Sequence, residues 1–367
     1  MMRSIHFRPA SRHRLLLPAL LLLAGCSGRP AVQPVRVVLF IGDGVGVAHW
    51  TAALVTTDSL AVGGMPVTGL MDTRADPDLV TDSAAAASAL ATGRRTRNGR
   101  IAMDREGEVL ETVVEVAEQA GRATGLVVTC SLTHATPAAF VAHVISRNRQ
   151  EEIAEQMAGA GVEVLLGGGV RYFDGARRRD GRDLLTGLRE IYPVVTTAQE
   201  LRALDVDRTE RLLGLFADEH PPAAPQREPT LAEMTSIALR VLAHDPDGFF
   251  LMVEGSQPDW LAHDHEPLEA LAVEVIDFDR AVAVALAFRQ AYPELLVVVT
   301  ADHETGGLAV VDGGGGRPVA AYTTGGHSAS LVPLFAAGPG AGRFSGLKTN
   351  AEVGRLLLEI VQGGEGP

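Results

Sequence analysis

The stretch Val35-Arg36-Val37-Val38-Leu39-Phe40-Ile41, followed by Gly42-Asp43-Gly44-Val45-Gly46, is the starting point for interpreting the whole sequence. The first part is an apolar run rich in β-branched residues, and the second is a turn hinged by glycines. This pattern predicts a strand that places Asp43 just beyond its carboxyl end. That position matters because ligands of open α/β sheets bind outside the carboxyl ends of the strands.

Three other segments place acids and imidazoles beside apolar runs. The first is 248–255, which contains Glu254 and is followed by Asp259 and His263. The second is 295–300, which is followed by Asp302, His303 and Glu304. The third is Gly325-Gly326-His327, which precedes the apolar run 331–337. Asp259 and His263 are four residues apart, so on a helix they share a face and can bind one ion, whereas His265 points elsewhere.

Carboxylates and neutral imidazoles suit Zn²⁺ and Mg²⁺, and none of these segments contains a cysteine. Taken singly, each side chain is more often a solvated loop residue or a helix cap. Taken together, four independent segments at strand ends favour a metal site, and the lack of thiolates fits catalysis better than a structural role.

Residues 80–93, Val-Thr-Asp-Ser-Ala-Ala-Ala-Ala-Ser-Ala-Leu-Ala-Thr-Gly, supply a hydroxyl. Serine is a favoured N-cap and alanine the best helix former, so we expect Ser83 to cap a helix. Free backbone N–H groups at such an end favour an anion such as phosphate. The hydroxyl becomes a good nucleophile only when a base or a metal activates it.

Strand-like and helix-like segments alternate along the chain, which is typical of one large layered α/β domain. Residues 218–228 contain three prolines and are expected to form a loop. This loop could overhang the cleft, but a plain connector is the safer interpretation. The 23 residues between His303 and His327 leave room for a β-hairpin. Strands are predicted near 36–41, 124–129, 163–166, 249–253, 295–300 and 332–336, and helices near 46–57, 84–92, 110–120, 151–159, 230–244, 267–290 and 350–361.

Short motifs then follow one another in a recognisable order between about residues 36 and 362. They are Ile41-Gly42-Asp43-Gly44, Thr81-Asp82-Ser83-Ala84-Ala85, His134-Ala135-Thr136-Pro137, His143-Val144-Ile145-Ser146-Arg147, Val253-Glu254-Gly255, Thr300-Ala301-Asp302-His303-Glu304-Thr305-Gly306-Gly307 and Gly326-His327-Ser328-Ala329. In these motifs the chain resembles the alkaline phosphatase family. The resemblance implies a three-layer α/β sandwich with a central, mostly parallel sheet, and a metal-dependent phosphomonoesterase that acts through a phosphoserine.

The resemblance also implies a role for each matching position. Ser83 would be the nucleophile, Arg147 would bind two phosphate oxygens, and Asp82 would hold Arg147 in place. Two zinc ions and a third ion, normally magnesium, are implied. Their ligands would be Asp43, Asp302 and His303 for the first zinc, Asp259, His263 and His327 for the second, and Asp43, Thr136 and Glu254 for the third ion.

Two positions depart from branches of the family. His134 stands where some members have aspartate, so an imidazole beside the third site could favour zinc or cobalt over magnesium. Trp260 stands where other members have lysine or histidine near the phosphate. Losing that cation should weaken the binding of product phosphate, although a half-buried aromatic on the cleft wall is an equally good explanation.

Residues 1–25 have the features of an export signal. Arginines precede the apolar run 15–23, which is shorter than the ~20 residues that span a membrane. Leu23-Ala24-Gly25-Cys26 resembles the bacterial lipobox, so we expect a lipid on Cys26, a tether over 26–34 and a catalytic domain over 35–362. The address would be the outer membrane facing the periplasm, or the cell surface. The alternative is a plain secretory peptide with an incidental cysteine.

The resemblance implies small-molecule phosphomonoesters as partners, and the charge of the chain argues against nucleic acid. Removing the four arginines of the signal changes the formal charge from −13 to −17, which argues against binding nucleic acid through a basic face. Cys130 is expected to be a small core residue. The sequence leaves the natural substrate and the oligomeric state open.

Two other functions fit part of the pattern. The same metals could serve a phosphodiester, phosphonate or sulfate ester hydrolase, but Arg147 suits a monoester, and the sulfatase signature Cys-x-Pro-x-Arg is missing. A non-catalytic surface lipoprotein that sequesters zinc would need neither Ser83 nor Arg147.

Overall fold

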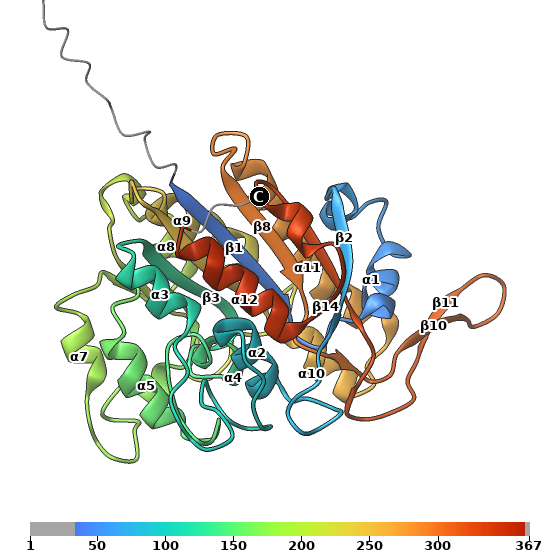
Figure 1. Ribbon diagram of the computed structural model, residues 1–367, viewed down its shortest axis with the longest axis horizontal. Coiled ribbons are helices and arrows are strands. Elements are labelled where there is room, and N and C mark those ends of the chain that lie inside the picture. Colours follow the sequence, from blue (N-terminus) through green and yellow to red (C-terminus); the bar gives the residue numbers. More distant parts are fainter. Residues whose placement is uncertain (1–33, 364–367) are drawn as a thin grey trace, which may run out of the picture. The chain divides into compact units, whose positions relative to one another are not determined.

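Residues 34–363 are described by a computed structural model, and they contain a sheet of ten strands in the order β14-β2-β13-β8-β1-β7-β3-β4-β6-β5 (Figure 1). Only β13 in this sheet runs antiparallel to its neighbours, β2 and β8. The strands are β1 (Val35–Gly42), β2 (Val67–Asp72), β3 (Ala123–Ser131), β4 (Val164–Gly168), β5 (Val194–Val195), β6 (Leu212–Leu215), β7 (Gly248–Gly255), β8 (Leu295–Thr300), β13 (Val332–Ala337) and β14 (Gly346–Thr349).

Helices cover both faces of the sheet. On one face α2 (Ser83–Thr92) and α3 (Val113–Gln119) pack against α12 (Asn350–Val361), which crosses in front of β1 in Figure 1. On the other face α1 (Val47–Leu54) and α9 (Leu231–Leu242) pack against α11 (Leu268–Phe288). The three-layer α/β sandwich predicted from the sequence is therefore confirmed. The remaining helices are α4 (Ala135–Ala138), α5 (Gln150–Gly159), α6 (Val170–Phe173), α7 (Leu184–Leu188), α8 (Ala198–Arg202) and α10 (Gln257–His263).

The central strands are apolar along their whole length because helices cover both faces. In β1, residues 37–41 are fully buried, and β1 pairs with β7 on one side and β8 on the other. Each fully buried valine, leucine, isoleucine or phenylalanine contributes about 1.5–3 kcal/mol. These strands therefore form a rigid base for whatever follows their ends.

The parallel strands bring their carboxyl ends to one edge of the sheet. Gly42 of β1 is in register with Gly255 of β7, and Ile41 is in register with Thr300 of β8. Because β13 is antiparallel, its start lies at this same edge, and Val332 pairs with Met71 near the end of β2. Segments that follow the parallel strands and the segment that precedes β13 therefore meet there.

All six predicted strands and seven predicted helices are present, with ends shifted by no more than three residues. The predicted hairpin between His303 and His327 is β10 (Ala309–Asp312) with β11 (Pro318–Ala321). The sequence patterns did not reveal β2, β5, β6 and β14. The two-residue strands β9 (Glu304–Thr305) and β12 (His327–Ser328) were not predicted either. They pair with each other and hold His327 next to the segment that follows β8.

The predicted signal peptide and Cys26 lie outside the described residues. Among residues 34–363, no helix combines the length and apolar character needed to cross a membrane.

Candidate active site

Asp43, Asp302 and His303 form a cluster whose side chains are fully buried. Asp43 follows β1, and the other two residues follow the neighbouring strand β8. Nε2 of His303 lies 3.2 Å from Oδ2 of Asp302 and 3.5 Å from Oδ1 of Asp43. Within the described part of the chain, both oxygens of Asp43 and Oδ2 of Asp302 have no hydrogen-bond partner. Unpaired buried carboxylate oxygens are costly, so this cluster fits a bound cation.

Asp259, His263 and His327 form a second cluster. Nδ1 of His263 donates to the carbonyl of Gly325, and Nδ1 of His327 donates to that of Thr81, each at 2.8 Å. These bonds leave the Nε2 lone pairs facing each other at 3.2 Å, beside Oδ1 of Asp259 at 3.3 and 3.6 Å. Converging lone pairs repel unless a cation lies between them, and backbone bonds to Nδ1 are typical of metal-binding histidines.

His265 lies outside this second cluster. Its Nε2 bonds the carbonyl of Thr324 at 2.9 Å, and its ring stacks on Tyr322. The expectation that His265 points away from its neighbours Asp259 and His263 is confirmed.

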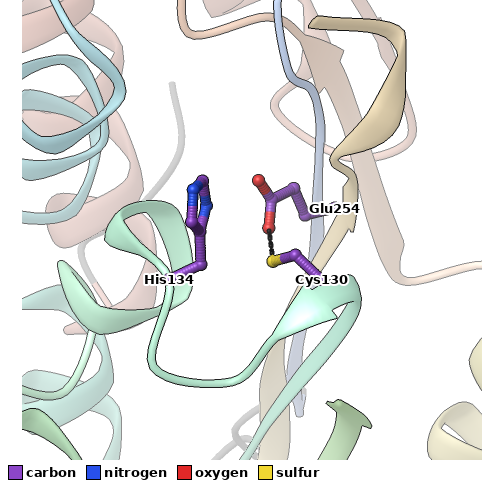
Figure 2. A group of neighbouring side chains, drawn as sticks. All are labelled: Cys130, His134 and Glu254. Carbon is purple, nitrogen blue, oxygen red and sulfur yellow. Dashed lines mark hydrogen bonds between the residues drawn. The ribbon is translucent and has the colours of Figure 1, made fainter. Parts of the chain in front are cut away.

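A third group surrounds Glu254, which is fully buried in β7. The thiol of Cys130, in β3, donates to Oε2 of Glu254 at 3.4 Å. His134 faces both residues from the loop after β3, and the ligand atoms of the three lie within 4.8 Å of one another (Figure 2). Thr136, the predicted third-site ligand beside them, is also fully buried, and its Oγ1 is unpartnered among residues 34–363.

Ser83 is the first residue of α2, and the prediction that it is the N-cap is wrong. Asp82 is the N-cap: its backbone is extended, and its Oδ1 accepts from the backbone N–H of Ala85 at 3.0 Å. Both residue types are good caps, and here the carboxylate satisfies the free N–H group. The Ser83 hydroxyl therefore remains free for another contact, and its Oγ lies 3.3 Å from Nε2 of His303.

Arg147 is linked to the start of α2 by Asp82, the residue that precedes Ser83. Its Nη1 donates to Oδ2 of Asp82 at 3.2 Å, and Oδ2 also accepts from the N–H of Gly99. Nη2 of Arg147 lies 3.1 Å from Nε2 of His134. Asp82 thus fixes both the start of α2 and the guanidinium, whose planar fork matches two oxygens of a phosphate.

Three aromatic rings form a wall on the side of Glu254. The ring of Trp260 lies 4.7 Å from that of His220 and 6.2 Å from that of His134 between centroids. His220 comes from the loop 218–228, and its Nδ1 accepts from the backbone N–H of Ser131 at 3.0 Å. The sequence favoured a plain connector over a loop that overhangs the cleft, yet this loop contributes a side chain to the site.

A buried ion-pair network anchors the loop 218–228. Arg227 is 2% exposed and donates to Glu274 at 2.8 and 2.9 Å and to Asp277 at 2.7 Å, both in α11. The backbone N–H of Ala224 also donates to Glu274. Since removing one partner of a buried ion pair is strongly destabilising, this network holds the loop and His220 in place.

The metal-free site carries too many buried negative charges for all of them to ionise. Burial, and then the charge of Asp302, raises the pKa of Asp43 well above its usual range. Burial, and then the same charge, raises the pKa of Glu254 to about 8. Burial acts on Asp302 in the same direction, but the charge and hydrogen bond of His303 hold its pKa below the usual range. Cations would remove this conflict.

The metal-free protein should become less stable as pH rises from about 5 to 9. Folding raises the pKa of Glu254 from 4.5 to about 8, so above pH 4.5 the folded state holds a proton that the unfolded state releases. This contribution is complete below pH 4.5 and is lost as pH rises through about 8. We expect the Tm of chelator-treated protein to fall by at least about 5 °C over this range. Differential scanning calorimetry would measure it.

Glu254→Gln is the control for this pH dependence, because it removes the titrating group and keeps the shape. The chelated variant should show a clearly smaller fall in Tm. An equal fall in both proteins would assign the effect to other groups.

The structure brings all the predicted site residues within residues 34–363 to one edge of the sheet, and their roles stay predictions. Sequence reasoning missed Cys130 as a neighbour of Glu254 and His220 as part of the wall. For Cys130 a signal existed: His134 follows it at position i+4, and the apolar run 124–129 ends just before it.

The profile described as Alkaline phosphatase matches residues 35–317 of this chain. Alkaline phosphatase 4 of Bacillus subtilis is 40% identical over 295 aligned residues, and the match covers 75% of this chain and 62% of that protein. Streptomycin-6-phosphate phosphatase of Streptomyces griseus is 37% identical over 409 residues, and the match covers 89% of this chain and 90% of that protein. The chain therefore spans less than two thirds of the Bacillus relative and most of the Streptomyces one.

Solved structures give the same picture. The alkaline phosphatase of the Antarctic bacterium TAB5 has a TM-score of 0.84 and 33% identity, covering 90% of this chain and 98% of that one. A variant of that enzyme, in which a histidine is replaced by aspartate, was solved with magnesium in its M3 site; it has a TM-score of 0.82, with the same identity and coverage.

Proposed function

Because this chain belongs to the alkaline phosphatase family, we propose that it hydrolyses phosphomonoesters through a phosphoserine at Ser83 and releases inorganic phosphate outside the cytoplasm. One observation carries this proposal. The Ser83 hydroxyl lies at the start of a ten-residue helix, 3.3 Å from Nε2 of His303 in a cluster with unpaired carboxylate oxygens. A nucleophile, an anion site and a cation site coincide there.

The residues of the two clusters fit a pair of zinc ions. Asp43, Asp302 and His303 would hold the ion beside Ser83, and the second cluster would hold the other. Such ions, when bound, lower the pKa of the attacking hydroxyl and stabilise the leaving oxygen. Arg147 binds the phosphate oxygens that face away from the clusters, and Asp82 keeps its guanidinium in line with Ser83.

A third ion would lie at Glu254. The buried, unpartnered oxygens of Asp43, Thr136 and Glu254 in the described structure are hard ligands that suit magnesium. The M3 magnesium of the TAB5 variant supports this choice. His134 adds an imidazole at the same place, so zinc or cobalt could replace magnesium.

The aromatic wall and the neighbouring surface would contact the alcohol part of the substrate. Trp260 offers an apolar face where a cation would bind phosphate more tightly, which favours release of the product. The chain next to Arg147 lines a polar cavity of about 690 Å³ with arginine and glutamate side chains. Small, polar phosphomonoesters fit these surroundings better than apolar ones.

The proposed organisation is a signal peptide over 1–25, a tether over 26–34 and one catalytic domain over 35–362. The mature protein would be exported and held by a lipid on Cys26, at the outer membrane facing the periplasm or at the cell surface.

Lipid attachment at Cys26 predicts an acylated cysteine at the mature N-terminus, because the motif Leu-Ala-Gly-Cys follows a short apolar core. Mass spectrometry of protein isolated from membranes should find it, and Cys26→Ser should release the protein into the soluble fraction. A mature N-terminus elsewhere, without lipid, would contradict this prediction.

The proposed activity can be tested with a monoester, a diester and a sulfate ester. Steady-state hydrolysis should be fastest for the monoester, should stop with a chelator and should return with Zn²⁺ and Mg²⁺. Faster turnover of the diester or the sulfate ester would assign the chain to another reaction on the same fold. No turnover of any ester by protein with bound zinc would favour the zinc-sequestering function.

Arg147→Ser should impair monoester hydrolysis much more than diester hydrolysis. A monoester offers two free non-bridging oxygens to the guanidinium fork in addition to the oxygen at the cations, whereas a diester has esterified one. A charge-assisted hydrogen bond is worth roughly 1.5–3 kcal/mol, so each lost bond should lower kcat/KM by about one to two powers of ten.

Arg105→Ser is the control for Arg147, since Arg105 pairs with Asp76 at 3.4 Å at the surface and does not line the cavity described above. It should change neither activity by more than a factor of about two. Equal losses on both substrates in Arg147→Ser would mean that Arg147 supports the site rather than selecting the substrate.

A further inference from the structure

Glu254 lies between two chemically different sets of neighbours. On one side are Asp43 and Thr136, whose oxygens are hard ligands. On the other are the sulfur of Cys130 and the imidazole of His134, and Figure 2 shows both facing Glu254. The proposed function uses the first set and places the imidazole of His134 beside the third ion. It gives Cys130 no role.

The second set has the separations of a compact metal site. Zinc binds sulfur at about 2.3 Å and carboxylate oxygen at about 2.0–2.2 Å, so two such ligands in a tetrahedral site lie roughly 3.5 Å apart. The observed distance from Sγ of Cys130 to Oε2 of Glu254 is 3.4 Å. All three ligand atoms lie within 4.8 Å of one another.

Unpaired polar atoms in the group also point to a ligand. Glu254 is fully buried, and within residues 34–363 its Oε1 has no hydrogen-bond partner. Nδ1 of His134 is buried and unpartnered in the same part of the chain, while its Nε2 faces Arg147. A buried thiol and a buried carboxylate on two strands, beside a half-buried imidazole and with two orphaned atoms, are arranged for a cation rather than for packing alone.

Cys130 lies two residues beyond the last pair of the ladder between β3 and β7. Cys130 lies in β3, where Val128 is in register with Glu254 of β7, and both side chains are fully buried. The thiol is therefore protected from solvent. Its contacts within the described structure are Glu254 and the carbonyl of Ser131, so rotation about one side-chain bond is enough to change its partner.

We propose that Cys130, His134 and Glu254 form a thiolate–imidazole–carboxylate site for Zn²⁺ or Co²⁺, which competes with magnesium for Glu254. On binding, the cation displaces the thiol proton, which passes to water, and no electron is transferred. Thiolate and imidazole select zinc and cobalt over magnesium, which prefers oxygen ligands. The inference rests on the proposed metal centre in sharing Glu254 and His134 with its third site, and it adds Cys130, which has no part in the proposed phosphoryl transfer.

Cobalt is the probe that distinguishes this site from the two histidine clusters. Those clusters contain only nitrogen and oxygen ligands. In the full mature chain with Cys26→Ser, Cys130 is the only thiol. A thiolate-to-cobalt charge-transfer band in the near-ultraviolet can therefore come from Cys130 alone. When metal-free protein is titrated with Co²⁺, we expect the intensity of this band to increase until one cobalt ion per chain occupies the site. Added Zn²⁺ should abolish the band.

Cys130→Ser tests the ligand in the same background, because serine keeps the size and the hydrogen bond to Glu254. The band should vanish. The affinity for the third cobalt ion should fall by at least about 10–100-fold, because the loss of a residue that only hydrogen-bonds to a ligand already has an effect of this size. The ratio of zinc to magnesium at the third site, measured by mass spectrometry after dialysis against both, should fall likewise. Ser131→Ala, one residue along β3, should leave the band unchanged.

The spectrum of the Cys26→Ser protein with Cys130 intact decides the matter even if Cys130→Ser fails to fold. Absence of the band at three equivalents of cobalt, in protein shown to be folded by circular dichroism, would overturn the proposal. Monoester hydrolysis by the zinc and magnesium form of the same preparation reports on the proposed function separately. An active enzyme without the band would refute the thiolate site alone. A band in a protein without activity would refute the phosphatase function alone.

Discussion

Ser83→Ala will lower kcat for a phosphomonoester by about 10³-fold or more, the scale seen when a covalent nucleophile is removed. The zinc content should stay near that of the wild type, because the hydroxyl contacts the cluster of Asp43, Asp302 and His303 only through one hydrogen bond at 3.3 Å. Rapid quenching of the wild type at low pH should trap a phosphoserine at position 83, which mass spectrometry of peptides can locate.

Ser88→Ala is the control on the same helix. Ser88 is fully buried, and its hydroxyl bonds the backbone of Arg100 and Ala102 rather than the site. This change should lower the free energy of unfolding by about 1–3 kcal/mol because a buried N–H loses its partner, and turnover should be nearly unchanged. Normal turnover in Ser83→Ala would mean that water attacks phosphorus directly and that no phosphoserine forms.

The long buried elements could be predicted from the sequence because burial on both faces leaves an unmistakable apolar run, as in β1 and β8. The strands that were missed are short or lie near the rim of the sheet. In β14 only four residues pair, and Leu347 is largely exposed, so neither length nor periodicity marks the strand. In β2, glycine and threonine interrupt the apolar pattern.

The candidate site was predictable where chemistry and strand ends coincide, as for Asp43 and Asp302. The cap of α2 was not, since aspartate and serine compete for one position and only the backbone decides. The neighbourhood of Cys130 was not predictable either. The distance between its sulfur and Glu254 depends on the register of two strands that lie more than one hundred residues apart in the sequence. Local patterns contain no information about such a register.

His263→Ala will lower kcat by about three powers of ten and remove one zinc ion per chain. One cation contributes several kcal/mol to the transition state of an in-line displacement, and each 1.4 kcal/mol is about tenfold in rate. His263 and His265 make a natural pair for this test. Each imidazole bonds a carbonyl of the same turn, that of Gly325 and that of Thr324, at nearly equal distances.

The two histidines differ in the partner of their Nε2 atom. Nε2 of His263 lies 3.2 Å from Nε2 of His327 in the second cluster. Nε2 of His265 instead donates to the carbonyl of Thr324, and the ring stacks on Tyr322. His265→Ala therefore removes a similar contact to the turn without removing a ligand. Its zinc content and kcat should stay within about twofold of the wild type, with only a modest loss of stability. If His265→Ala lost the metal and His263→Ala kept it, the cluster would be held together by the turn rather than by its lone pairs.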